Sequence, residues 1–249
     1  MGNRSLEYNK KRLEGFIKRV ANINDKEFID KVSKVIEYRK EYSAEGITSL
    51  LIKTSLENVD ESNPKWTFIA NKFFIESLYK GASINRVYSS KDKYGDYYGL
   101  QKVLAGKGIY SHHILEKYSK EEIDRAGKMI VPERDYLFTY IGSHMLANRY
   151  LATDHDKNIF ELPQERWLTI AMYLMQDEDK NKRMELVEEA YWALSNLYMT
   201  VATPTLANAG KTHGQLSSCF VDTVDDSLEG IYNSNTDVAK LSKSGGGIG

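Results

Sequence analysis

Residues 203–249 of this 249-residue chain hold most of the side chains whose type and spacing could do chemistry. Cys219 is the only cysteine of the sequence, and it follows Ser217 and Ser218 in the run SSCF. An accessible thiol can serve as a nucleophile or a redox group, whereas free cysteine is also one of the residue types most often buried for packing alone. The residues next to Cys219, taken alone, favour its interpretation as a small buried hydrophobic residue on a strand.

Three other features of the sequence could serve a ligand, and each is a weak signal. The run SGGGIG at residues 244–249 could bring backbone amides close to a phosphate, but it matches neither the P-loop nor the dinucleotide pattern. His213 lies shortly before Cys219, yet no acid is evident to orient a Cys–His nucleophilic pair. His112 and His113 have no third ligand at metal-binding spacing, so we predict no metal site there.

The elements that must position these groups are predicted to be mainly helical. Apolar residues recur at helical spacing in residues 25–40, again after the candidate N-cap Ser43, and again after residues 63–64. Three amphipathic helices can close a small bundle, which we place in residues 1–82. The polar run YSSKDKYGDYY at residues 88–98 is rich in turn formers and is typical of a linker.

Helix-start signals also mark the next part of the chain. Ser119 and Glu122 stand at capping-box spacing, and Pro163 suits the first turn of a helix. A further helix is predicted from Lys182 to Tyr198.

The character of the sequence changes after residue 198. TVATPTLANAGKTHG is rich in small and turn-forming residues, and SSCFVDTV predicts a short buried strand. Asp226 is the predicted cap of a helix that runs to about Lys243. A strand, a helix and a glycine-rich turn in this order are typical of the opening of an α/β barrel. One or two strands cannot close a barrel, because their edges would stay unpaired. We therefore expect the chain to be interrupted within a barrel.

Charge and composition exclude several classes of protein. With 34 basic and 35 acidic residues, the formal net charge is −1, which predicts neither a nucleic-acid nor a membrane partner. No apolar run approaches the roughly 20 residues needed to span a bilayer. The charged start carries no signal-peptide core, and a single cysteine excludes an internal disulfide. A reducing, cytoplasmic location is the expectation.

Four segments together are more specific than any one of them. TPTLANAG, GQLSSCF, DDSLEGI and LSKSGGGIG, at their spacings here, resemble the start of the catalytic barrel in the large subunits of class I ribonucleotide reductases. YGLQKVLAGKGIYSHHILEKYSKEEID and PERDYLFTYIGSHMLANRYL resemble the helical N-terminal domain of that family. The resemblance implies a mainly α fold. Its parts are a partial ATP-cone helical bundle at 1–82, the helical reductase domain at 83–199, and the first strands and helix of a ten-stranded α/β barrel at 200–249.

The resemblance also implies roles for residues that match the family's motifs. Thr203, Ser218 and Cys219 match positions that contact the substrate, a ribonucleoside diphosphate, and Gly247 matches a backbone contact to its phosphates. Cys219 matches one half of the redox pair that reduces the substrate and ends as a disulfide. Such a thiol must be accessible to the ribose.

Effector sites are implied at two places. Asp226, Ser227 and Leu228 match the beginning of the specificity site, which binds a deoxynucleoside triphosphate at the dimer interface. The N-terminal unit resembles an ATP cone, which senses ATP against dATP. Its candidate nucleotide contacts are Leu6, Glu7, Tyr8, Asn9, Lys10, Lys11, Arg12 and Lys80. The cone's opening strand is missing from this sequence, and Ala44 stands where a threonine is common. A degenerate cone that no longer switches activity is therefore a second interpretation.

The implied reaction needs more than this sequence contains. Further cysteines, a carboxylate and a tyrosine pair lie in parts of the family beyond the position of Gly249. We expect the chain to be inactive alone, as a piece of a split large subunit or the part before an inserted element. The implied partners are the C-terminal portion of the large subunit, a radical-generating small subunit that carries the metal, a second assembled large subunit, and indirectly a thioredoxin- or glutaredoxin-type reductant. The alternatives are a non-catalytic regulatory or decoy fragment that binds nucleotide, and a fragment of a cobalamin-dependent class II reductase.

Overall fold

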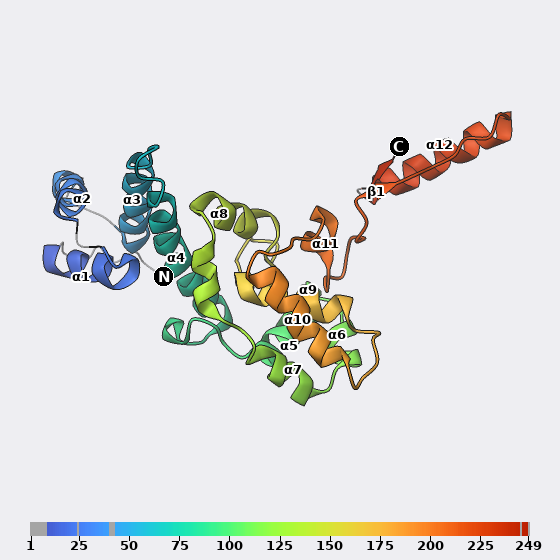
Figure 1. Ribbon diagram of the computed structural model, residues 1–249, viewed down its shortest axis with the longest axis horizontal. Coiled ribbons are helices and arrows are strands. Elements are labelled where there is room, and N and C mark those ends of the chain that lie inside the picture. Colours follow the sequence, from blue (N-terminus) through green and yellow to red (C-terminus); the bar gives the residue numbers. More distant parts are fainter. Residues whose placement is uncertain (1–8, 24, 40–42, 245, 249) are drawn as a thin grey trace. The chain divides into compact units, whose positions relative to one another are not determined.

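The computed structural model describes residues 9–23, 25–39, 43–244 and 246–248, which form two compact units. The first unit comprises residues 1–95 and 131–148, and the second comprises residues 96–130 and 149–249. The described residues are mostly helical, as predicted, and their two strands are two residues long each (Figure 1). The three predicted domain segments remain a prediction.

Four helices dominate the first unit: α1 (Lys10–Ala21), α2 (Lys26–Arg39), α3 (Ala44–Glu57) and α4 (Trp66–Arg86). The three helices predicted from periodicity are confirmed as α2, α3 and α4. Ser43 caps α3 as predicted, because its hydroxyl accepts a hydrogen bond from the Gly46 amide at 3.0 Å. Helices α3 and α4 lie side by side (Figure 1).

A single apolar cluster joins the four helices of the first unit. Ile17, Val32, Leu51 and Phe73 come from α1, α2, α3 and α4 respectively, and all four are fully buried. Burying apolar side chains of this size is the main stabilising contribution to a bundle of short helices, since helices of 12–14 residues are marginal alone.

The predicted linker at residues 88–98 contains the point, between Gly95 and Asp96, at which the chain passes from the first unit to the second, but it is not a free tether. It contains the short 3-10 helix η1 (Ser90–Asp92), and its Tyr94 hydroxyl donates to Asp135 at 2.7 Å. Asp135 lies in η2 (Pro132–Leu137), is fully buried, and also accepts from Tyr79 at 2.7 Å. Two tyrosine donors satisfy this carboxylate, so the polar run is held in place by its aromatic residues rather than left as a tether. Helix α8 (Tyr140–Arg149) follows η2.

Five helices build the body of the second unit: α5 (Tyr97–Gly106), α6 (His113–Lys117), α7 (Lys120–Gly127), α9 (Pro163–Leu174) and α10 (Arg183–Ser195). The predicted capping box of α7 is confirmed in both directions, at 2.7 Å and 3.2 Å between Ser119 and Glu122. Pro163 opens α9 as predicted. Helix α10 ends at Ser195, three residues before the predicted end.

The last segment contains α11 (Thr203–Asn208), β1 (Cys219–Phe220), α12 (Leu228–Lys243) and β2 (Gly247–Ile248). The turn-rich TPTLAN sequence forms a short helix. Two details of the prediction are wrong. The strand is two residues long and Cys219 is exposed, so SSCFVDTV is not a buried strand. The cap of α12 is Ser227, whose hydroxyl accepts from the Gly230 amide at 3.0 Å, and not Asp226.

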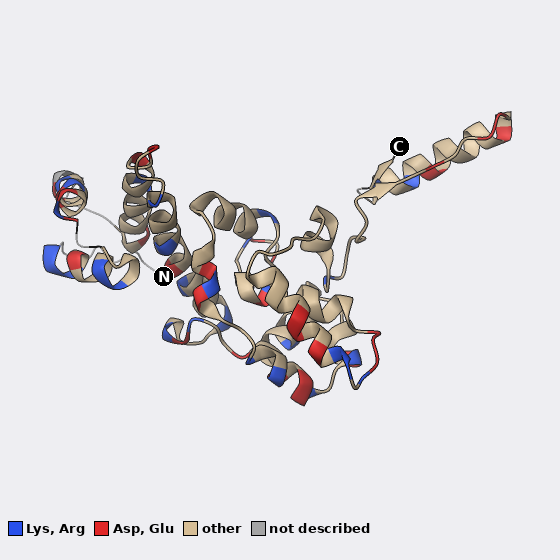
Figure 2. Ribbon diagram, viewed as in Figure 1, with Lys and Arg blue, Asp and Glu red and all other residues tan. Residues whose placement is uncertain are grey.

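Basic and acidic side chains are interspersed along the helices of both units, for example on α7 and α10 (Figure 2). Among the described residues, no helix combines the length and apolar character that a membrane span requires.

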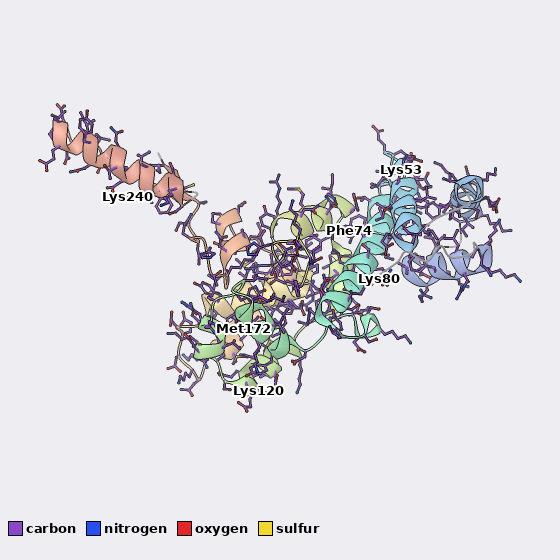
Figure 3. All side chains as sticks on the ribbon, turned by 180° about the vertical axis from the view of Figure 1, so that it is seen from behind. Lys53, Phe74, Lys80, Lys120, Met172 and Lys240 are labelled. Carbon is purple, nitrogen blue, oxygen red and sulfur yellow. The ribbon has the colours of Figure 1, made fainter. Side chains whose placement is uncertain are left out.

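Substituting Leu51 by alanine tests the core of the first unit. Leu51 is fully buried on α3, so we expect Leu51→Ala to lower the free energy of unfolding by roughly 2–5 kcal/mol. Lys53→Ala on the same helix is the matched control, because Lys53 is 75% exposed and its ion pair with Glu57 is long at 4.0 Å (Figure 3). It should change stability by less than about 0.5 kcal/mol. Urea titrations followed by circular dichroism measure both; equal effects would contradict this account of the core.

Candidate functional site

Three of the four predicted substrate residues meet where β1 and β2 pair. The strands run parallel, with Cys219 opposite Gly247 and Phe220 opposite Ile248. The Gly247 amide donates to the Ser218 carbonyl at 3.1 Å. Helix α12 connects the two strands, and the predicted order of a strand, a helix and a glycine-rich segment is present, with β2 lying in that segment. Ser218, Cys219 and Gly247 therefore form one surface, named here the thiol site.

The thiol at this site is accessible. Cys219 is an exposed free cysteine, and the Ser218 hydroxyl lies 3.6 Å from its sulfur, which is a weak contact. The interpretation of Cys219 as a buried packing residue is therefore wrong. An exposed thiol beside a serine hydroxyl and a glycine amide can meet a substrate directly, as redox chemistry requires.

Gly246, in the glycine run beside the thiol site, is required by packing. A Cβ atom at Gly246 would lie 2.6 Å from the Phe220 ring, closer than any relaxed contact allows. Glycine lets the chain pass over this ring and bring Gly247 to Ser218. The close approach of the Phe220 ring is therefore the local cause of the glycine at position 246.

Thr203, the fourth predicted substrate residue, begins α11 and is exposed. Within the described residues it makes no hydrogen bond to the thiol site. Helix α11 is nevertheless bonded to the segment that leads to β1, the strand that carries Cys219. The Thr205 hydroxyl donates to the Leu216 carbonyl at 2.9 Å, and the Asn208 amide group donates to the Gln215 carbonyl at 2.9 Å.

A buried polar network that no sequence motif predicted underlies the loop after α11. Glu161 and Arg166 are fully buried and form an ion pair of 3.5 Å at the start of α9. Arg166 also donates to the carbonyl of Ala209, the residue after α11. The available signal was the charged residues on both sides of Pro163, namely Glu161, Glu165 and Arg166.

Lys211 lies beside this network. Its ammonium donates to the Tyr150 carbonyl at 2.8 Å, and residue 211 forms an isolated antiparallel bridge with Tyr110. Burial lowers the pKa of Lys211 from its ordinary 10.5 to about 8. The nearby Glu161 carboxylate opposes that shift, and Arg166 adds to it.

The predicted specificity-site residues lie at the start of α12. Ser227 caps the helix, Leu228 is 75% exposed, and Asp226 is exposed. None of the described residues of α12 is buried, and its side chains project freely around Lys240 (Figure 3). The Ser234 hydroxyl donates to Asp222 at 2.5 Å and fastens the preceding loop to the helix.

A cavity of about 780 Å³ lies within the first unit. Its polar lining includes predicted nucleotide contacts and residues beside them, namely Asn9, Arg12, Glu45, Thr48 and Lys80. Aromatic side chains line other parts of the cavity, namely Phe16, Phe74, Tyr140 and His144. Lys80 and Phe74 both belong to α4 (Figure 3). The structure thus brings together Asn9, Arg12 and Lys80 from two distant parts of the sequence.

Charge in this cavity is balanced rather than purely basic. The Lys80 ammonium lies 3.2 Å from the Glu45 carboxylate. The pKa of Glu45 is lowered by a hydrogen bond from its own backbone amide and then by Lys80. Glu76 also lines the cavity, and burial raises the pKa of its carboxyl. A polyphosphate would have to displace Glu45 from Lys80.

The remaining predicted contacts divide into two groups. Lys10 faces away to α2, where it pairs with Asp30 at 2.7 Å, and Lys11 is exposed outside the cavity lining. Leu6, Glu7 and Tyr8 lie outside the described residues. In the part of the chain that the structure describes, no three histidine, cysteine or acidic side chains gather as a metal site would require.

Comparison with known proteins gives two family matches and several close relatives. Residues 136–214 match the ribonucleotide reductase all-alpha domain, and residues 217–249 match the ribonucleotide reductase barrel domain. The ribonucleoside-diphosphate reductase subunit alpha of Helicobacter pylori (strain ATCC 700392 / 26695) is 37% identical over 214 residues, which cover 86% of this chain and 26% of the relative.

Two further relatives carry the same name. The subunit of Treponema pallidum is 39% identical over 220 residues, which cover 87% of this chain and 25% of the relative. The subunit of Enterobacteria phage T4 is 31% identical over 227 residues, which cover 87% of this chain and 28% of the relative. The chain thus spans about a quarter of the length of the curated relatives that it matches.

The lowered pKa of Lys211 predicts a pH-dependent stability. Between pH 8 and pH 10.5 the unfolded chain holds a proton that the folded chain has released, so stability should rise with pH over this window. The slope is at most about 1.4 kcal/mol per pH unit. Lys211→Met should lack this rise, whereas the exposed control Lys180→Met should keep it. Denaturant midpoints at pH 7, 8, 9 and 10 measure the effect; parallel curves for Lys211→Met and the unsubstituted chain would refute it.

Proposed function

This chain belongs to the ribonucleotide reductase large-subunit family, of which it matches an N-terminal portion, and we propose that it provides part of a ribonucleoside-diphosphate reductase active site. The observation that carries the proposal is the thiol site. An exposed Cys219 lies beside Ser218 and opposite Gly247, the arrangement expected of a redox thiol next to a phosphate-contacting glycine.

The proposed reaction removes the 2′-hydroxyl of a ribonucleoside diphosphate as water. Two thiols provide the two electrons and two hydrogen atoms, and they become a disulfide. Cys219 is one of these thiols in the proposal. Thr203 and Ser218 orient the substrate, and the backbone around Gly247 contacts its phosphates. The product, a deoxyribonucleoside diphosphate, serves DNA synthesis.

The second thiol must come from other residues, because Cys219 is the only cysteine in this sequence. We propose that further barrel residues provide it, either on the same polypeptide or on a separate C-terminal one. The same residues would contribute the radical-forming cysteine and the carboxylate. A radical-generating small subunit that carries the metal, a second assembled large subunit, and a thioredoxin- or glutaredoxin-type reductant complete the proposed system. Asp226, Ser227 and Leu228 would begin the deoxynucleoside triphosphate site of that assembly, in the cytoplasm.

The redox role of Cys219 can be tested directly. We expect reduction of ribonucleoside diphosphates when this chain is combined with the remaining barrel portion and a radical-generating small subunit. Cys219→Ser should abolish turnover, since serine cannot form the disulfide. Ser242→Ala is the control, because Ser242 is exposed on α12 and belongs to no proposed site. Formation of deoxyribonucleoside diphosphate measures the outcome, and full turnover by Cys219→Ser would exclude Cys219 from the redox pair.

Nucleotide binding in the first unit is a second candidate function, and the cavity favours it. Arg12 and Lys80 can each donate charge-assisted hydrogen bonds to a phosphate, while the aromatic lining can pack against a base. We propose that ATP or dATP binds here, as in an ATP cone. Glu45 and Glu76 weaken the attraction for a polyphosphate. A purely regulatory protein would bind nucleotide in this way and support no turnover.

Binding of ATP by the chain tests this second function. Arg12→Gln combined with Lys80→Gln should weaken binding by at least tenfold, since each charged hydrogen bond contributes about 1.5–3 kcal/mol. Glu45→Gln should strengthen binding, because it removes a negative charge and releases Lys80. Lys18→Gln is the control, as Lys18 is an exposed residue of α1 outside the cavity lining. Isothermal titration calorimetry provides the affinities. Equal affinity in the double variant and the control would place the nucleotide elsewhere, and absence of binding by the unsubstituted chain would indicate a degenerate cone.

A further inference from the structure

The start of α9 is an unusual place for two charges. Glu161 and Arg166 have no exposed surface, and their side chains meet at 3.5 Å. Desolvating both groups is costly, so an ion pair of this kind is weak evidence for stability by itself. The ion pair is better explained by the segments to which Glu161 and Arg166 are hydrogen-bonded.

Glu161 is satisfied by its surroundings even without Arg166. The Tyr110 hydroxyl donates to one carboxylate oxygen, and the backbone amide of Ala152 donates to the other at 2.7 Å. Glu161 therefore does not depend on Arg166 alone for its hydrogen bonds. Arg166 is less well satisfied, since its Nε is buried and has no hydrogen-bond partner among the described residues.

The second contact of Arg166 explains its position. One terminal nitrogen donates to the Ala209 carbonyl, across 43 residues of sequence. Ala209 is itself fully buried and directly follows α11. The guanidinium therefore links α9 to the end of α11, and the Glu161 carboxylate compensates its positive charge.

The residues after Ala209 are held just as closely. The Ser111 amide donates to the Gly210 carbonyl at 2.9 Å, and the Thr212 amide donates to the Ile109 carbonyl at 3.2 Å. Gly210 has φ +77°, and a Cβ atom there would lie 2.8 Å from a methyl group of Thr169. Only glycine fits this left-handed, close approach to α9.

Further hydrogen bonds connect α11, held at Ala209, to the segment that precedes the thiol site. Thr205 and Asn208 of α11 donate to the carbonyls of Leu216 and Gln215, both at 2.9 Å. Leu216 is three residues before Cys219. A shift of the Ala209 carbonyl would therefore move the end of α11 and the peptide that leads to Cys219.

We propose that Arg166, compensated by Glu161, is a positioning residue that fixes the α11 loop and, through it, the place of Thr203 and Cys219. The expected effect on turnover rests on the proposed reductase function. The expected effect on the position of the loop rests on the hydrogen bonds alone. Arg166 touches no substrate position itself. It acts through the Ala209 carbonyl.

A double variant and a matched control pair distinguish a loss of loop positioning from a loss of folding. Arg166→Met alone leaves Glu161 with a buried negative charge, and it can fail to fold for that reason. Glu161→Gln combined with Arg166→Met removes both charges. The amide oxygen introduced by Glu161→Gln can still accept a hydrogen bond from Tyr110 or Ala152, but the Ala209 carbonyl is left unanchored. The control pair is Glu122→Gln with Arg183→Met. It removes the mostly buried ion pair between α7 and α10 in the same unit, which does not touch the loop.

The single cysteine makes the structural consequence measurable in the chain itself. A nitroxide spin label attached to Cys219 reports the mobility of the thiol site by electron paramagnetic resonance. We expect a more mobile label in the Glu161→Gln/Arg166→Met variant and an unchanged label in the control pair. An unchanged label in both variants would overturn the proposal.

The catalytic consequence is measured in the assembled reductase. The Glu161→Gln/Arg166→Met variant should lose about 10- to 100-fold in kcat for ribonucleoside diphosphate. Misplacement of a substrate-contacting group by about 1 Å is enough for such a loss. The control pair should retain the activity of the unsubstituted protein. If the unsubstituted assembly is inactive, the reductase proposal fails while the spin-label result still decides the anchor. If it is active and the Glu161→Gln/Arg166→Met variant equals it, the positioning role is overturned.

Discussion

Helix α9 is buried along its first ten residues, so its polar side chains need partners inside the second unit. Gln164 accepts from the Tyr191 hydroxyl at 2.9 Å, and Thr169 meets the Tyr97 hydroxyl at 2.9 Å. Arg166 and Glu161 complete the set toward α11. These bonds orient α5, α10 and the loop before Cys219 around one helix. The loop before the thiol site is held to this arrangement at the carbonyl of Ala209 and by the bonds of Gly210, Lys211 and Thr212.

Local signals in the sequence were sufficient to predict most helices, but not the polar contacts in the interior of the second unit. Ser43, the Ser119–Glu122 box and Pro163 act on the backbone within three or four residues, so a reader of the sequence can locate them. Arg166 could not be recognised in this way, since its partner Ala209 is 43 residues away. An arginine in a helix is usually exposed, and only the tertiary contacts show that this one is not.

The candidate sites were predictable to different degrees. The motif resemblance selected Ser218, Cys219 and Gly247, and the parallel register brings them together. Burial of Cys219 could not be decided from the sequence SSCFVDTV, because burial depends on what packs against a strand. Among the described residues only β2 pairs with β1. The choice between Asp226 and Ser227 as helix cap was equally open, since both residue types cap helices well.

The distances along the chain between the partners of α9 also bear on the order of folding. The α3–α4 hairpin joins neighbouring helices, whereas the Tyr97–Thr169 contact spans 72 residues and the Ser111–Gly210 contact spans 99. Contacts between distant residues form late, because a long loop must close before they are made. On a ribosome, the anchor of α11 cannot form until residue 210 has emerged. The segment before Cys219 therefore acquires its anchor on α9 later than the α3–α4 hairpin acquires its contacts.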